Sequence, residues 1–563
     1  MIKDDLKRLI EAAIERAGAT GDLPAVSLPE IVLEHPARLD LGDYATNVAL
    51  RLQRQVGKPP REVAGAITHH LELPASVSAV EVAGPGFINF FLADGWLQEQ
   101  VDDILAAGPD FGKLDIGAGK TVQVEFVSAN PTGPLHVGAA RNAALGDTVA
   151  RLMAATGHSV QREYYINDAG SQTLALAGSV LARYKQQHGR DAALPEGGYQ
   201  GEYVLELAQE VTKAFGGDLL DVPDGEAAEK IGGLIEGIIL RWIERDLADL
   251  GVQFDRWYSE RTLYEGELFD NSLRFLREAG HIVERDGAVW FNSTELGEDR
   301  DNVVIRSDGR PTYFASDIAY HYEKLAIRNY DRVIDVWAAD HHGHVPRMKA
   351  VLGAMEIDPN RLTVLLYQLV KLFKDGKELK MSKRAGDYVT VRELLDEVGT
   401  DAARFFLIQR SADVTMNFDM NLARQTTDEN PVYYVQYAHA RTASIFREAA
   451  TRAGSADYAD GDVHLLTSDS ELGLIRKLLM FPEIVESAAE TLAAHQVPFY
   501  LLELATAFSA FYRDCPVLPP RNSDPALVKA RLKLVAATRQ VLASGLGLIG
   551  VSAPDRMADR AAT

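Results

Sequence analysis

A single histidine, His136, lies in the segment ANPTGPLHVGAARNAALGD (129–147), directly after a loop rich in proline and glycine. A strand-like run, TVQVEFVS, precedes the loop, and an alanine-rich helical pattern follows it. A helix N-terminus presents unpaired N–H groups that bind phosphates, and a histidine there can donate hydrogen bonds to charge that develops in nucleotidyl transfer. Gly138 would let an adenine ring approach the backbone. A surface histidine at a helix start is the alternative interpretation.

A basic loop, KLFKDGKELKMSKRAGDYVT (371–390), is the second candidate for chemistry. Lys380 and Lys383 flank a Met-Ser pair and could clamp triphosphate oxygens during a displacement at the α-phosphate. A solvated run of surface lysines is the alternative. Because both motifs occur in this order on an alternation of strands and helices, the pair is far more specific than either motif alone.

Three regions of the chain are expected to position these motifs. Residues 1–110 predict a small α/β domain, and a linker rich in glycine and aspartate follows it. Residues 118–420 alternate helices with the strands TVQVEFVS, SVQREYYIN, AVWFNS, NVVIRS, PTYFAS, DRVIDVWAA and RLTVLLYQLV. This α/β alternation predicts a Rossmann-like, doubly wound parallel sheet, with a helical insertion at about 171–258. Residues 425–563 carry only helical periods and predict an all-α bundle.

Composition narrows the classes of function. The net charge of −23 argues against nucleic-acid binding when taken alone, although an acidic protein can still carry local basic stripes. No run of about 18 apolar residues exists, and the charged N-terminal helix lacks the features of a secretion signal. The single cysteine, Cys515, excludes an internal disulfide and a zinc site built on a cysteine cluster. Together these features indicate a cytoplasmic protein without a membrane partner.

Two short segments carry a resemblance to a known family. HVGA resembles the HIGH signature and KMSKR the KMSKS signature of class I aminoacyl-tRNA synthetases. The segments VEFVSANPTGPLHVG, YYINDAG, GYQGEYV, PTYFASDIAYH and NPVYYVQYAHAR are similar to arginyl-tRNA synthetases of bacterial type, as are LGDYATNVALRLQ and AGPGFINFFL near the N-terminus. The resemblance covers essentially the whole chain. Ala139 and Arg384 depart from the last positions of the two signatures, and Ala139 leaves His136 to carry the hydrogen bonding to phosphate.

The resemblance implies an arginine–tRNA ligase, which activates arginine with ATP to arginyl-adenylate and transfers the arginyl group to the 3′ end of tRNA. Its catalytic residues would be His136, Lys380 and Lys383. The implied ATP-binding residues are Pro131, Gly133, His136, Gly138, Ala139, Met381, Ser382 and Lys383. Mg²⁺ would accompany ATP, held largely by phosphates and water. Protein-bound zinc is not expected, because the adjacent histidines of ADHHGH (339–344) rarely converge on one ion.

An arginine substrate requires carboxylates, because its guanidinium group presents only hydrogen-bond donors. The resemblance places Glu125 and Asn130 near the α-amino end of the substrate, and Tyr313 and Asp317 near its side chain. The further candidates for contact with arginine are Ser128, Asp340 and His341. Without the resemblance, the alternatives are a strand-edge salt bridge for Glu125 and a helix N-cap for Asp317.

The outer regions supply the expected contacts to tRNA(Arg). Phe87 and Asn89 of GFIN match positions that read a base of the tRNA D-loop in related enzymes, and a core phenylalanine is the alternative. Tyr433 and Tyr437 lie at helical spacing and could stack on anticodon bases, although such a stripe more often belongs to a core. Arg441 is a candidate for a phosphate contact. The expected assembly is a monomer.

Three rival functions stay open at this point. A small-molecule nucleotidyl transferase would share the histidine motif but is usually a short single domain. A non-catalytic tRNA-binding paralogue would suit the loss of histidine at Ala139. A class I synthetase for another amino acid, such as glutamate, would be opposed by the carboxylates, because like charges repel strongly in a site of low dielectric. A requirement for bound tRNA before arginine is activated is a hypothesis from the resemblance alone.

Overall fold

The computed structural model describes residues 1–169, 171–379, 388–453, 456–518 and 524–557. Contacts between residues divide the chain into two compact units. The first unit comprises Met1–Phe111, Ala438–Pro482 and Glu503–Leu542, and the second comprises Gly112–Tyr437, Glu483–Leu502 and Ala543–Thr563. Within the described ranges, no helix is both long enough and apolar enough to cross a membrane.

The N-terminal segment of the first unit is an α/β fold, as predicted. A four-stranded antiparallel sheet has the order β1-β2-β4-β3. The elements are α1 (Ile2–Thr20), β1 (Leu33–Glu34), β2 (Tyr44–Thr46), α2 (Val48–Val56), α3 (Pro60–His69), β3 (Val77–Ala83), β4 (Phe87–Leu92) and α4 (Asp94–Ala107). Helix α1 buries Leu6, Ile10 and Ile14 at helical spacing, so one face of this helix belongs to the core.

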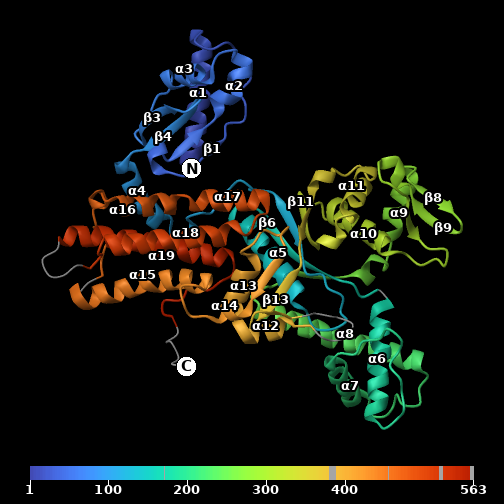
Figure 1. Cartoon of the computed structure of the whole chain (residues 1–563). Coiled ribbons are helices and arrows are strands. Elements are labelled where there is room, and N and C mark those ends of the chain that lie inside the picture. The colour runs from blue at the N-terminus through green and yellow to red at the C-terminus, as the bar shows by residue number, and fades with distance from the viewer. Residues whose placement is uncertain (170, 380–387, 454–455, 519–523, 558–563) are drawn as a thin grey trace. The chain divides into compact units, whose positions relative to one another are not determined.

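Five parallel strands form the central sheet of the second unit, in the order β12-β11-β5-β6-β7 (Figure 1). They are β5 (Thr121–Glu125), β6 (Ser159–Ile166), β7 (Arg256–Ser259), β11 (Arg332–Ala338) and β12 (Leu362–Tyr367). Successive side chains of β5 point to opposite faces, and helix α5 (Val137–Ala155) packs against this strand. The amide of Gln123 on β5 donates to the hydroxyl of Tyr320 on helix α10 (Tyr313–Tyr322), which covers the other face. Helices on both faces confirm the doubly wound parallel sheet.

Three of the predicted strands are not in this sheet. AVWFNS and NVVIRS contribute β9 (Ala288–Phe291) and β10 (Asn302–Ile305), which pair antiparallel in a separate sheet with β8 (Ile282–Arg285). PTYFAS, predicted as a strand from its aromatic residues, instead begins α10. Thr312 is the N-cap of that helix, because its hydroxyl oxygen accepts the N–H of Ala315 at 3.4 Å.

Helices dominate the inserted segment and the C-terminal region, as expected. The inserted segment contains α6 (Ser171–Gln187), α7 (Glu202–Phe215) and α8 (Asp224–Asp249). The other elements up to residue 424 are α9 (Leu268–Glu278), α11 (His344–Ala354), β13 (Val370–Lys374), β14 (Lys377–Glu378), α12 (Val391–Val398), α13 (Thr400–Ile408), β15 (Met416–Asp419) and α14 (Met420–Arg424). The later elements are α15 (Pro431–Ala453), α16 (Asp469–Leu479), α17 (Phe481–Thr491), α18 (Gln496–Asp514) and α19 (Pro525–Leu548).

Candidate functional site at the end of strand β5

The loop from β5 to α5 leaves the carboxyl end of the middle strand of the parallel sheet, where open α/β sheets bind ligands. His136 is the N-cap of α5, and its Nδ1 accepts the backbone N–H of Gly138 at 3.0 Å. Neutral His136 therefore carries its proton on Nε2. A Cβ atom at position 138 would lie 2.8 Å from Cε1 of His136 and would clash with it. The His136 ring itself therefore requires a glycine at this position.

The structure brings the first motif next to the end of the second. The backbone N–H of Val137 donates to the carbonyl of Val389 at 3.2 Å, and the N–H of Val391 donates to the carbonyl of Leu135 at 2.8 Å. The ring of Tyr388 lies edge-on to the ring of His136, with centroids 6.4 Å apart. Residues 380–387 of the basic loop, which include Lys380, Met381, Ser382 and Lys383, lie outside the described residues. The end of this loop is thus fixed beside His136 across about 250 residues of sequence.

Two residues in the loop that follows β5 and Phe126 have a left-handed backbone. Val127 has φ 67° and Ser128 has φ 40°, a conformation that costs about 1 to 3 kcal/mol for a residue other than glycine. Asn142 of α5 holds this turn, because its Oδ1 accepts the N–H of Val127 at 2.6 Å while its Nδ2 donates to the carbonyl of Val336 at 2.9 Å. The turn directs the hydroxyl of Ser128 to Oε1 of Glu125, at 2.9 Å.

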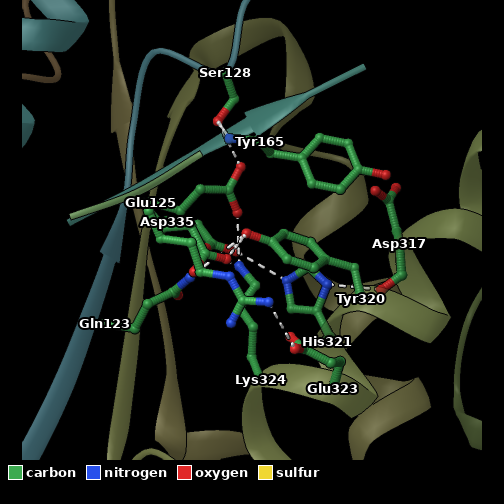
Figure 2. Close-up of polar contacts among 12 residues, drawn as sticks. Gln123, Glu125, Ser128, Tyr165, Asp317, Tyr320, His321, Glu323, Lys324 and Asp335 are labelled. Carbon is green, nitrogen blue, oxygen red and sulfur yellow. Dashed lines mark hydrogen bonds and ion pairs between the residues drawn. The ribbon is translucent and has the colours of Figure 1, made fainter. Parts of the chain in front are cut away.

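Three carboxylates lie side by side across the central strands. Asp335 on β11 and Glu163 on β6 are the register partners of Glu125 on β5, so all three side chains point to the same face of the sheet. Figure 2 shows two of them, Glu125 and Asp335, side by side. Lys324 donates to Glu125 Oε2 at 2.6 Å and to Asp335 Oδ1 at 2.8 Å. Arg328 pairs with Glu163. The strand-edge salt bridge that was the alternative interpretation of Glu125 is therefore present, but it lies in the protein interior.

Burial acts differently on the two carboxylates that share Lys324. Burial raises the pKa of Glu125, which is 8% exposed, and the ammonium of Lys324 offsets only part of this effect. Burial also opposes ionisation of Asp335, but the charge of Lys324 and the hydrogen bond from His321 outweigh it and lower the pKa to about 2. Asp335 is therefore ionised, and Glu125 is the carboxylate whose charge depends on its partners.

Asp317 lies in the second turn of α10, so it is neither the residue after a strand nor a helix N-cap. Its Oδ2 accepts a hydrogen bond from Nε2 of His344 at 2.8 Å, and the Asp317 side chain is 33% exposed. Tyr313, one turn earlier, is exposed and lines an open pocket of about 490 Å³. Figure 2 shows the side chain of Tyr165 lying beside Asp317.

Glu260 also lines this pocket and was missed by the sequence analysis. It follows the four-residue strand β7 and is only 3% exposed. Burial raises the pKa of its carboxyl group, and the nearby charges of Asp317 and Asp168 raise it further. Among the described residues, its Oε2 is a buried acceptor without a hydrogen-bond partner. The available signal was a carboxylate at the carboxyl end of a strand, but the sequence analysis assigned most of β7 to the helical insertion.

Other predicted residues lie farther from this pocket or in other parts of the chain. Asp340 and His341 lie on a short turn after β11, with side chains 79% and 61% exposed, and neither lines the pocket. Asn130 donates to Gln172 at 2.7 Å. Pro131, Gly133 and Ala139 are buried in the loop and first turn around His136. Groups of three or more histidine, cysteine or acidic side chains that could hold a metal ion are absent from the described residues.

The predicted tRNA contacts occupy the outer regions. Phe87 begins β4, and Asn89 on the same strand is only 4% exposed. Tyr433 and Tyr437 stack on one another along α15, with ring centroids 6.2 Å apart. Tyr433 also lines an open pocket of about 500 Å³. The guanidinium group of Arg441 lies over the ring of Tyr512, 5.1 Å from its centroid.

Comparison with known families matches nearly all of the chain. Residues 4–92 match the arginyl tRNA synthetase N terminal domain, residues 100–446 match the catalytic domain of tRNA synthetases class I (R), and residues 435–557 match the DALR anticodon binding domain. The central match alone spans more than half of the sequence.

Individual proteins give the same result. The chain is 46% identical over 556 residues to an arginine–tRNA ligase of Dehalococcoides mccartyi, with 99% of each chain covered. It is 47% identical over 558 residues to an arginine–tRNA ligase of Syntrophotalea carbinolica, covering 99% of this chain and 100% of the relative. Among solved structures, the Thermus thermophilus arginyl-tRNA synthetase has the same fold, with a TM-score of 0.77 at 24% identity over 98% of this chain and 100% of that chain.

Proposed function

Because the chain belongs to the arginyl-tRNA synthetase family and joins arginine to tRNA with ATP, we propose how its residues divide that reaction. In the first step the carboxylate of arginine attacks the α-phosphorus of ATP, and the bond to the β-phosphate oxygen breaks, which releases diphosphate. In the second step a hydroxyl of the terminal adenosine of tRNA attacks the carbonyl carbon of arginyl-adenylate, and AMP leaves. Neither step requires a nucleophile from the protein, so positioning and electrostatic stabilisation supply the catalysis.

His136 and the two motif lysines act on the phosphates. In the neutral ring of His136 the proton lies on Nε2, because Nδ1 accepts the N–H of Gly138, so Nε2 is the atom that we assign to a phosphate oxygen. Lys380 and Lys383 neutralise charge on the leaving diphosphate, and Mg²⁺ enters with ATP. The ATP-binding positions are those of the two motifs: Pro131, Gly133, Gly138, Ala139, Met381 and Ser382. The single observation that supports this assignment is the backbone pairing of Leu135 and Val137 with Val391 and Val389, which follow Lys383 closely in the sequence.

Arginine lies between two acidic ends. Glu125, with Ser128 and Asn130 beside it, receives the α-ammonium group, while Tyr313, Asp317 and Glu260 receive the guanidinium group. Glu260 supports the choice of a cationic side chain, because its buried carboxylate has an oxygen without a donor among the described residues. An anionic substrate such as glutamate would meet the like charges of Asp317 and Glu260.

The outer regions hold tRNA(Arg). Phe87 and Asn89 contact the D-loop, Tyr433 and Tyr437 offer stacking surfaces to the anticodon, and Arg441 contacts phosphate. The low exposure of Asn89 means that a base contact there requires some local movement. The enzyme works as a monomer in the cytoplasm, and bound tRNA completes the active site before arginine is activated.

The test is ATP–diphosphate exchange dependent on arginine, measured with and without tRNA(Arg), beside lysine and glutamate. Exchange with arginine only in the presence of tRNA supports the assignment and the induced fit. Exchange without tRNA keeps the assignment and overturns the induced fit. Tight tRNA binding without exchange in either condition would indicate a non-catalytic tRNA-binding protein. The loss of histidine at Ala139 would then be the first explanation to test.

A further inference from the structure

Lys324 is a buried cation that has no place in the reaction as assigned so far. Its side chain has no exposed surface, and its ammonium group lies between the carboxylates of Glu125 and Asp335. Such a buried pair contributes little net stability, because the cost of removing charges from water offsets their attraction. Lys324 lies beside Glu125, the carboxylate that we assign to the substrate's α-ammonium group, and this location points to a role in binding.

The geometry of α10 explains how the lysine reaches this position. Asp317, His321 and Lys324 follow one another at spacings of four and three residues, which places them on one face of the helix. The helix continues into a π-helical turn, Glu323–Ile327, in which the N–H of Arg328 donates to the carbonyl of Glu323 at 2.8 Å. Such turns often occur at functional sites. This one directs Lys324 and Arg328 to neighbouring carboxylates of the sheet.

A continuous buried chain joins the two ends of the proposed arginine site (Figure 2). Ser128 donates to one oxygen of Glu125, and Lys324 donates to the other. Asp335 receives Lys324 on one oxygen and contacts Nε2 of His321 on the other at 2.8 Å. Nδ1 of His321 lies 2.8 Å from the carbonyl oxygen of Asp317 and donates to it. Both oxygens of Glu125 are therefore fixed before any ligand arrives.

We propose that Lys324 is a positioning residue for the substrate, which holds the carboxylate of Glu125 charged and oriented toward the α-ammonium group of arginine. The proposal rests on the assignment of Glu125 to that group. Without Lys324, Glu125 and Asp335 would be neighbouring buried carboxylates, and one of them would take up a proton. Glu125 would take it, because burial already raises its pKa while Asp335 keeps the contact with His321.

Four variants separate positioning from a merely structural role. Lys324→Met removes the ammonium group at similar size. Lys324→Met with Asp335→Asn removes the cation together with the second carboxylate, so the double variant no longer has two unpaired neighbouring charges. Arg328→Met is the matched control, because Arg328 leaves the same π-turn and pairs with Glu163, the register partner on the far side of Glu125. Glu125→Gln tests the premise.

The measured quantities are KM for arginine, KM for ATP, the thermal unfolding temperature, and inhibition by 5-guanidinopentanoate, which is arginine without its α-amino group. Exchange assays contain saturating tRNA(Arg). Lys324→Met is expected to raise KM for arginine about ten- to hundredfold, the effect of losing a charged hydrogen bond. KM for ATP and the inhibition constant should stay within about twofold, because neither ligand meets Glu125. The double variant should regain the unfolding temperature of the natural protein. Its KM for arginine should stay raised, because the hydrogen bond from Lys324 that orients Glu125 is still missing.

Three results would overturn the proposal. If KM for arginine recovers together with stability in the double variant, Lys324 has a structural role only. If Arg328→Met raises KM for arginine as much as Lys324→Met does, any disturbance of the π-turn is sufficient. If Glu125→Gln leaves KM for arginine unchanged, the assignment of Glu125 to the α-ammonium group is also wrong. If Lys324→Met does not fold, the double variant decides alone: a raised KM for arginine with an unchanged inhibition constant supports the proposal, and an unchanged KM for arginine overturns it.

Discussion

Two buried charge clusters of the second unit differ in how completely they are closed. Arg404 on α13 is fully buried, and its three nitrogens donate to the carbonyl of Ile549 at 2.8 Å, the carbonyl of Leu250 at 3.0 Å and Oδ2 of Asp147 at 2.6 Å. Lys324 is as fully buried as Arg404, but Glu125 in its cluster retains some exposure and lies beside a strained turn.

This difference indicates which cluster serves stability and which serves binding. The Arg404 cluster joins α5 to α13, the end of α8 and the residues after α19, and each guanidinium nitrogen has a partner within these elements. The cluster at the end of β5 lies beside Val127 and Ser128, whose left-handed backbone costs stability that folding alone does not require. Strain and incomplete closure coincide at the proposed arginine site.

The largest expected effect is on the closed cluster. Arg404→Met leaves Asp147 buried, and its cationic partners among the described residues are then Arg151 and the more distant Arg162. The free energy of unfolding should fall by about 3 kcal/mol, measured by denaturant titration of the second unit's transition. KM for arginine, measured well below the unfolding temperature, should stay within about twofold. A large change in KM with little loss of stability would reverse the roles of the two clusters.

The next largest effect is on catalysis at the open site. His136→Ala removes the side chain that we assign to the phosphates, and kcat of exchange should fall about a hundredfold or more. The lost N-cap should lower the free energy of unfolding by only about 1 kcal/mol. If the loss of folded protein accounts for the whole decrease in kcat, His136 is not a catalytic residue.

Glu260→Gln should weaken arginine binding by about 2 kcal/mol, because it removes the negative charge that we pair with the guanidinium group. KM for arginine should therefore rise roughly thirtyfold. Burial raises the pKa of Glu260, so in the natural protein KM for arginine should increase as pH falls and this carboxylate takes up a proton. The Gln variant should lose this part of the pH dependence. An unchanged pH profile would contradict the assignment of Glu260.

The smallest effect should separate function from stability within one residue. Ser128→Gly places glycine at a φ of 40°, which relieves strain and should raise the free energy of unfolding by up to about 1 kcal/mol. The same change removes the hydroxyl bonds to Glu125 and to the N–H of Tyr165, so KM for arginine should increase about threefold to tenfold. Loss of both stability and affinity would show that the strained turn has no functional meaning.

The sequence predicted those parts of the fold that local patterns encode. Strands β5, β6, β11 and β12 were found because short runs rich in β-branched and aromatic residues, bounded by turns, favour strands. PTYFAS was misassigned because its aromatic residues have strand propensity, whereas the N-cap Thr312 and the packing around it give a helix. Propensity is outweighed here by tertiary context.

Site residues that belong to a motif were predicted, and site residues that only the packing of the fold brings to the site were missed. His136, Glu125 and Asp317 were named from motifs, but Glu260 follows a strand of only four residues and Lys324 looks like a solvated lysine on a helix. The backbone pairing beside His136 has no side-chain signal at all, because main-chain hydrogen bonds are available to every residue type.

The most direct test of the central claim compares Glu125→Gln with the natural protein, using arginine as substrate and 5-guanidinopentanoate as competitor. If the open cluster receives the α-ammonium group, the variant should lose affinity for arginine about tenfold or more and bind the competitor as before. Equal losses for both ligands, or no loss for either, would contradict the claim that this cluster binds the amino end of the substrate.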